Sequence, residues 1–200
     1  MQATSRMSAL PGLTLVTGGA ASGKSAWAEA LVAGSAQMPH YMATGRAEGA
    51  EMTEKIARHR AMRGPGWITV EAGADAAARL AGLPARALLL DCATLWLAAV
   101  MEAGLDVEAE VAAFAHALAH APYPCAVVTN ELGHGMVPMD AGARAFRDAH
   151  GRMNQALAAR ASLVVLVACG LPLALKGALP AADPALIPEG GPAAALGGGA

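Results

Sequence analysis

Short runs of apolar residues recur along the chain, and most are separated by longer segments whose apolar positions follow the period of a helix. The runs at 87–91, 125–130 and 162–168 are almost continuously apolar, which is typical of strands buried on both faces of a parallel sheet. The pattern predicts seven strands, at 13–16, 40–44, 67–71, 87–91, 125–130, 162–168 and 172–176.

Helices are predicted between many of these strands, at 24–34, 49–63, 74–81, 93–120 and 141–160. Strands that alternate with helices indicate an α/β doubly wound fold, with a mostly parallel sheet and helices on both faces. Little more than Gly170-Leu171 separates the last two strands, and so tight a connection predicts an antiparallel hairpin at one edge. We therefore expect one domain over 13–176, after an extension at 1–12 and before an Ala-, Gly- and Pro-rich tail at 177–200.

Composition excludes several classes of protein. The 200 residues are 55% hydrophobic and 15% charged, and the net charge is -2, so the overall charge balance does not indicate binding to nucleic acid or to an anionic membrane. No apolar run is long enough to span a bilayer, and no signal peptide precedes residue 13. The cysteines Cys92, Cys125 and Cys169 are widely spaced, and we expect reduced thiols in a cytoplasmic protein.

A loop of small residues joins the first predicted strand to the first predicted helix. It fits the pattern G-x-x-x-x-G-K-[ST], in which backbone N–H groups converge on phosphate oxygens and the helix N-terminus adds a favourable dipole. The alternative is a glycine-rich turn with an incidental Lys-Ser pair, but the strand before the loop and the helix after it argue against that. The loop is predicted to hold a nucleoside triphosphate with Mg²⁺, through Gly18, Gly19, Ala20, Ala21, Ser22, Gly23, Lys24 and Ser25.

An acidic residue for the metal is expected at the same edge of the sheet. Asp91 closes a buried apolar strand, and ligands bind at the carboxyl ends of strands in an open α/β sheet. Alone, such an acid is a common way to end a strand. Together with the loop it is the natural partner of Ser25 in holding Mg²⁺, directly or through water.

The predicted helix at 49–63 is strongly basic and carries one histidine. Helical spacing puts Met52, Ile56, His59 and Arg63 on one stripe, so His59 would face the body of the protein. One interpretation is a solvated basic helix whose histidine bonds a core carbonyl. The other is a histidine beside phosphates, where neutral imidazole is a competent nucleophile for phosphorus at pH 7.

Five segments occur in an order that resembles one enzyme family: TGGAASGKSAWAEAL, KIARHRAMRGPGWITVE, LLLDCATLWL, VVTNELGHGMVP and FRDAHGRMNQALAARASLVVLVACGLPLALK. Together they resemble the bifunctional adenosylcobinamide kinase / adenosylcobinamide-phosphate guanylyltransferase of cobalamin biosynthesis, over residues 13–176. The phosphate loop is shared by very many families, whereas the H-R-x-x-R…W-x-T-x-E and T-N-E-x-G-x-G-x-V-P segments are far more specific.

The resemblance implies a P-loop NTPase domain similar to the RecA core, often assembled as a homotrimer. It implies phosphorylation of the aminopropanol hydroxyl of adenosylcobinamide. GMP then passes from GTP to adenosylcobinamide phosphate through a guanylylated histidine, with ATP as an alternative donor for the first step. His59 matches the histidine, and Lys24 acts with it on the phosphates. Nucleotide contacts beyond the loop are implied for Ala43, Thr44, Gly45, Arg60, Ala61, Met62, Arg63, Glu71 and Asp91.

Other polar residues leave their roles open. His134, Asn130 and Glu131 lie in a glycine-rich loop after a buried strand, where turn formation and substrate contact are equally good explanations. His116 and His120 have a metal-ligand spacing without a visible third ligand, which favours a helix-surface pair. The predicted helix at 141–160 carries five further polar residues: Arg144, Arg147, Arg152, Asn154 and Gln155. A polar, solvent-exposed helix surface is an adequate explanation for them, and a trimer contact or a substrate phosphate site is the alternative.

Two other functions fit parts of the sequence. One is a P-loop kinase of another small hydroxyl compound, in which His59 is structural. The other is a nucleotide-dependent switch or assembly ATPase, against which the basic histidine helix counts. Covalent labelling of the protein by α-labelled GTP separates the two-step enzyme from both.

Overall fold

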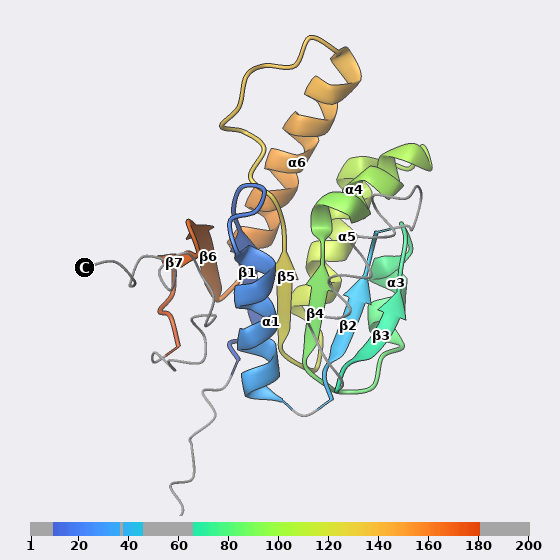
Figure 1. Cartoon of the computed structure of the whole chain (residues 1–200). Coiled ribbons are helices and arrows are strands. Elements are labelled where there is room, and N and C mark those ends of the chain that lie inside the picture. Colours follow the sequence, from blue (N-terminus) through green and yellow to red (C-terminus); the bar gives the residue numbers. More distant parts are fainter. Residues whose placement is uncertain (1–9, 37, 46–65, 181–200) are drawn as a thin grey trace, which may run out of the picture.

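The computed structural model describes residues 10–36, 38–45 and 66–180 (Figure 1). Within these residues, seven strands form one sheet in the order β3-β2-β4-β5-β1-β6-β7. The strands are β1 (Leu13–Thr17), β2 (His40–Ala43), β3 (Ile68–Glu71), β4 (Leu88–Asp91), β5 (Cys125–Val128), β6 (Leu163–Ala168) and β7 (Leu171–Lys176). All seven predicted strands are confirmed, with ends that differ by one or two residues.

Five helices pack on this sheet in the part of the chain that the structure describes: α1 (Lys24–Ser35), α3 (Ala76–Ala81), α4 (Ala93–Glu102), α5 (Val107–Ala119) and α6 (Ala141–Arg160). The predicted helix at 49–63 lies outside the described residues, as do most of the N-terminal extension and most of the tail. None of the described helices is long and apolar enough to cross a bilayer.

The prediction of one continuous helix over 93–120 was wrong. Gly104 adopts the left-handed region at φ 66°, which ends α4 after Glu102. Asp106 then starts α5 as its N-cap, because its side chain accepts hydrogen bonds from the backbone N–H groups of Glu108 and Ala109. The two helices therefore form a bend, and the rings of Trp96 and Phe114 stack across it with centroids 4.0 Å apart.

The sheet is parallel except at one edge. The pairs β2–β3, β2–β4, β4–β5, β1–β5 and β1–β6 are parallel, whereas β6–β7 is antiparallel, which confirms the predicted edge hairpin. In this register Ala43 lies beside both Glu71 and Asp91, and Asp91 lies beside Val128. The carboxyl ends of β3, β2, β4 and β5 therefore meet at one edge, next to the end of β1.

The core has two halves, one on each face of the sheet (Figure 1). Along β4, Leu88 and Leu90 face the half that also contains side chains of α3, α4, α5 and α6, whereas Leu89 faces the half that contains α1. Strands buried on both faces need helices on both faces, and this fold has them. The fold is that of a P-loop NTPase, as predicted.

Candidate active site

The phosphate loop connects β1 to α1 through a backbone that depends on two glycines. Gly18 is buried where β1 ends, and a Cβ atom there would collide with the carbonyl oxygen of Val167 and the hydroxyl of Ser22. Gly23 precedes α1 at φ 93°, in the left-handed region that costs glycine least. These constraints explain why glycines flank the loop.

The loop is held from both sides by hydrogen bonds. The Glu131 N–H after β5 donates to the Gly18 carbonyl at 3.0 Å, and the Gly170 N–H in the β6–β7 turn donates to the Ser22 carbonyl at 2.9 Å. Lys24 curls over the loop, and its Nζ donates to the Gly19 carbonyl at 3.1 Å. The lysine side chain therefore lies against the loop, where it could reach a phosphate group that the loop binds.

Asp91 ends β4 two strands from β1, because β5 lies between them. The Tyr41 hydroxyl donates a hydrogen bond to Oδ2 of the half-buried Asp91 carboxylate, at 2.7 Å. The ring of Tyr41 is itself packed edge-on against Trp67, with centroids 6.1 Å apart. The fold therefore orients this carboxylate at the predicted edge.

Thr44 ties the end of β2 to the turn that follows Asp91. Its buried hydroxyl donates to the Cys92 carbonyl at 2.6 Å and accepts from the Cys92 N–H at 2.9 Å. Burial, followed by the Asp91 charge, raises the pKa of the Cys92 thiol, so this cysteine stays a neutral packing group. Ala43 directly precedes Thr44 and Gly45 directly follows it, so Ala43, Thr44 and Gly45 all lie near Asp91.

Several predicted site residues therefore share one edge of the sheet, namely the loop residues 18–25, the segment 43–45, Asp91 and the exposed Glu71 at the end of β3. The predicted nucleophile and its basic neighbours lie outside the described residues: His59, Arg60, Ala61, Met62 and Arg63.

A buried polar cluster behind this edge joins α4, α6 and the end of β5. Asn130 donates to Thr94 Oγ1 twice, from its backbone N–H at 3.0 Å and from Nδ2 at 3.1 Å. Thr129 Oγ1 donates to Asn154 Oδ1 at 2.8 Å, and Asn154 Nδ2 donates to the Asn130 carbonyl at 3.0 Å. The cluster fixes the chain between the buried strand and Glu131, which bonds the phosphate loop.

His150 completes this cluster in its neutral form. Its Nε2 lies 3.0 Å from Thr94 Oγ1 and 3.3 Å from Thr129 Oγ1. Because Thr94 Oγ1 already accepts two hydrogen bonds from Asn130, its own hydrogen is available to Nε2, which then acts as acceptor. Burial lowers the pKa of His150, and the charge of Glu131 opposes this in part.

Little in the sequence indicates this cluster. Thr94, Thr129 and His150 carry no pattern that distinguishes them from core or helix-surface residues. A polar residue directly after a buried strand, as at Thr129, is the one signal that could have indicated it.

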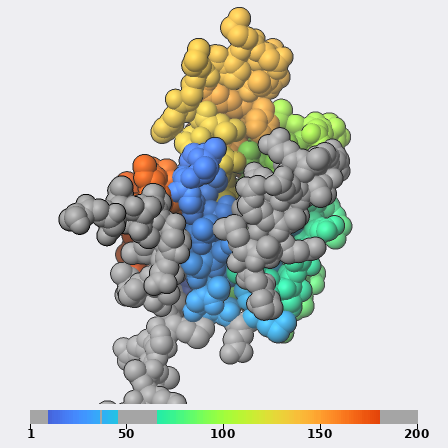
Figure 2. Space-filling view, in the orientation of Figure 1, coloured from blue at the N-terminus to red at the C-terminus, as the bar shows by residue number. Residues whose placement is uncertain are grey.

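Two arginines of α6 hold the loop that follows β5. Arg147 donates to the carbonyls of Gly133 at 2.5 Å and Met136 at 3.1 Å. Arg144 donates to the carbonyls of Pro138 and Met139, at 2.9 Å and 2.7 Å. This loop and the start of α6 project beyond the body of the molecule (Figure 2). Both arginines thus have a structural role in shaping the loop.

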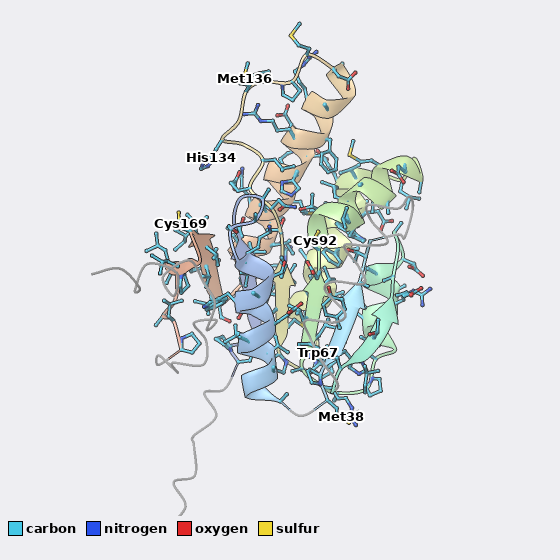
Figure 3. The ribbon with its side chains drawn as sticks, in the orientation of Figure 1. Met38, Trp67, Cys92, His134, Met136 and Cys169 are labelled. Atoms are coloured by element: carbon cyan, nitrogen blue, oxygen red, sulfur yellow. The ribbon has the colours of Figure 1, made fainter. Side chains whose placement is uncertain are left out.

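A hollow opens beside the phosphate loop, on the side away from Asp91. It has a volume of about 460 Å³ and is lined by loop residues 19–22, by Glu131 and His134, and by residues 166–169 at the end of β6. Figure 3 shows His134 and Cys169 on one side of the loop and Cys92, next to Asp91, on the other. The phosphate loop therefore separates two regions in which a ligand could extend.

The chain matches known proteins over most of its length. The family model described as CobU, cobinamide kinase / cobinamide phosphate guanyltransferase, matches residues 14–175. The chain is 40% identical over 169 residues to the bifunctional adenosylcobalamin biosynthesis protein CobP of Pseudomonas aeruginosa, which covers 82% of this chain and 96% of that protein. It is 37% identical over 183 residues to the bifunctional adenosylcobalamin biosynthesis protein CobU of Salmonella typhimurium, covering 82% and 99%.

Among solved structures, the fold of this chain is similar to that of the flagellar accessory protein FlaH of Methanocaldococcus jannaschii. The TM-score is 0.50 at 13% identity, over 84% of this chain and 80% of that chain. At this identity the likeness concerns the fold alone.

Proposed function

Because the chain belongs to the cobinamide kinase / cobinamide phosphate guanyltransferase family, we propose that it is a bifunctional enzyme of adenosylcobalamin biosynthesis. It phosphorylates the aminopropanol hydroxyl of adenosylcobinamide and then transfers GMP from GTP to the new phosphate. The observation that carries this proposal is that the phosphate loop and Asp91 lie at the same edge of the sheet, within a chain that the family model matches over residues 14–175.

In the kinase step the substrate hydroxyl attacks the γ-phosphorus of a triphosphate. A new P–O bond forms, the bond to the β-phosphate oxygen breaks, the hydroxyl proton leaves to solvent, and a nucleoside diphosphate is released. Lys24 offsets the negative charge on the β- and γ-phosphates as the bond breaks. Its fold over the loop, with Nζ 3.1 Å from the Gly19 carbonyl, supports this role.

In the transferase step we assign the nucleophile to His59. Its neutral imidazole nitrogen forms a P–N bond with the α-phosphorus of GTP while the α–β bond breaks and pyrophosphate leaves. An oxygen of adenosylcobinamide phosphate then displaces the histidine, which gives adenosylcobinamide-GDP. Arg60 and Arg63 offset the phosphate charge nearby.

Contacts to the GMP portion of GTP are proposed for the segment 43–45, the segment 60–63 and Glu71, by the match to the family. The sheet register supports this proposal, because Ala43 lies beside both Glu71 and Asp91 at the same edge. For the kinase step, ATP and GTP are both candidate donors.

Mg²⁺ fits the residues at this edge. The Ser25 hydroxyl and the Asp91 carboxylate are oxygen donors of the kind that Mg²⁺ prefers. Asp91 is half-buried at a strand end and oriented by Tyr41, so its charge is held in a fixed position. When bound, the ion neutralises charge on the β- and γ-phosphates.

We also propose that copies of the chain associate, as a homotrimer by the match to the family. Support comes from apolar side chains that soluble monomers seldom expose together. The loop after β5 exposes Met136 and Met139 almost completely, at 94% and 96%, with Val137 between them at 69%.

The test is to measure the two half-reactions separately. Adenosylcobinamide with Mg²⁺ and γ-labelled ATP or GTP should yield labelled adenosylcobinamide phosphate. The protein alone with α-labelled GTP should acquire an acid-labile covalent label, as expected for a P–N bond. Kinase activity on other hydroxyl compounds without covalent labelling would favour a simple P-loop kinase instead.

A further inference from the structure

We propose that the hollow beside the phosphate loop holds the nucleoside of the triphosphate during the kinase step, and that the GMP portion of GTP binds on the opposite side of the loop during guanylylation. One phosphate loop would then serve two nucleoside sites. The second half of this inference depends on the proposed function, whereas the first half depends on the hollow alone.

The positions of the predicted Mg²⁺ ligands indicate in which direction the triphosphate lies along the loop. Lys24 would contact the β- and γ-phosphates, and Ser25 and Asp91 would hold the Mg²⁺ ion bound to them. Asp91 lies on the β5–β4 side of β1, about 10 Å away at ordinary strand spacing. The γ-phosphate therefore points toward β4, and the α-phosphate with its nucleoside points toward β6, where the hollow opens.

The size and chemistry of the hollow suit a nucleoside. Its volume of about 460 Å³ is within the range of small-molecule sites, about 300 to 1,000 Å³. The half-buried Leu166 and the exposed Ala168 contribute apolar surface for the flat faces of a base, and Glu131 and His134 contribute polar groups for hydroxyls and ring edges.

The proposed guanylyl contacts are too far away to share this position. Glu71 lies on β3, four strands from β1 across β5, β4 and β2, which is about 19 Å at ordinary strand spacing. A nucleoside in the hollow lies on the other side of β1. If Ala43, Thr44, Gly45 and Glu71 contact GMP, the two reactions use two placements of the nucleoside on the same loop.

The unmodified protein provides a direct test, because Cys169 lines the hollow and is exposed, whereas Cys92 and Cys125 are buried. Alkylation of Cys169 by N-ethylmaleimide is followed by mass spectrometry with Mg²⁺ and either adenylyl imidodiphosphate or tripolyphosphate. We expect the nucleotide analogue to slow alkylation about tenfold or more, since a bound ligand buries most of its surface. Tripolyphosphate should leave the rate nearly unchanged.

Equal protection by tripolyphosphate, or no protection when calorimetry shows the analogue bound, would overturn the proposal. This experiment needs no corrinoid. Protection of Cys169 in a protein that makes no adenosylcobinamide phosphate would therefore contradict the proposed function and leave the hollow as a nucleoside site.

A variant whose larger side chain fills the hollow tests whether the two half-reactions use different nucleoside sites. Ala168→Phe should raise the KM for ATP in the kinase step about tenfold, because the added ring occupies part of the hollow in which the nucleoside would bind. Guanylylation by α-labelled GTP should stay near the unmodified rate. The matched control is Ala178→Phe, the same change at an exposed position outside the hollow. If Ala168→Phe weakens both half-reactions equally, one nucleoside placement serves both and the proposal is wrong.

Discussion

Tyr41 and Asp91 are joined by a hydrogen bond of 2.7 Å between the phenol hydroxyl and Oδ2 of the carboxylate, across two neighbouring parallel strands. The bond uses one carboxylate oxygen to fix the direction of the side chain. It therefore makes the charge and the orientation of Asp91 separable by mutation.

Asp91→Asn should lower Mg²⁺-dependent turnover in both half-reactions without unfolding the domain. The amide keeps the volume of the side chain and can accept the Tyr41 hydrogen bond, but it loses the charge. We expect a loss of about a hundredfold, the usual scale for one electrostatic group at a transferring phosphate. Titration of turnover against Mg²⁺ checks this, and an unchanged Mg²⁺ dependence would remove Asp91 from the site. Tyr41→Phe is the matched comparison, since it keeps the charge and should cost much less.

Lys24→Ala should abolish both half-reactions, with a loss of about a hundredfold or more in each. The lysine is the mobile cation of the loop, and its Nζ already lies over the Gly19 carbonyl. Circular dichroism should show an intact fold, because the Lys24 side chain is only partly buried and is not part of the apolar core. Near-normal turnover by the folded variant would refute the assignment of this loop.

His150→Gln should flatten the dependence of stability on pH. Burial lowers the pKa of His150, so between its ordinary and its lowered pKa the unfolded chain binds more protons than the folded one. Stability is therefore highest above pH 6.5 and falls as the pH drops through the region between the two values. Glutamine offers a neutral acceptor to Thr94 and removes this proton uptake.

Urea unfolding at pH 7.5 and at pH 5.0 measures the effect. The free energy lost between these pH values should be smaller in His150→Gln than in the unmodified protein. Some loss should remain, because burial and the charge of Arg86 also lower the pKa of His40. The exposed His116 gives the control, and an equal flattening by His116→Gln would contradict a specific role for His150.

Sequence reasoning succeeded where a local pattern carries the physical cause. The run LLLD at β4 is apolar because both faces of the strand are buried, so both the strand and the place of Asp91 could be predicted. The loop 18–25 could be predicted because the spacing G-x-x-x-x-G-K-[ST] is itself a local pattern, and it lies between an apolar strand and a helix.

The rest depends on contacts between distant segments. Thr94 and His150 are 56 positions apart, and nothing in either neighbourhood specifies the other. The bend after α4 was missed because apolar residues continue at helical spacing through 93–120, and this masked the signals of Gly104 and Asp106. The strand order, which leaves β5 between the phosphate loop and Asp91, also has no local signature.

The last prediction concerns the residue that separates the two chemistries. His59→Ala should eliminate the covalent GMP adduct and the transfer of GMP to adenosylcobinamide phosphate, because the P–N bond then has no nucleophile. Much of the kinase step should remain, since transfer of the γ-phosphoryl group needs no covalent histidine. In the unmodified protein, adduct formation should decrease as the pH falls through the histidine pKa, near 6.5 if that value is unperturbed, because only neutral imidazole attacks. The rates of the two half-reactions, measured on the same preparation of His59→Ala, decide the matter. Retained guanylyl transfer would mean that another histidine or direct displacement does the work. An equal loss of both steps would indicate that His59 is structural and would favour a simple kinase.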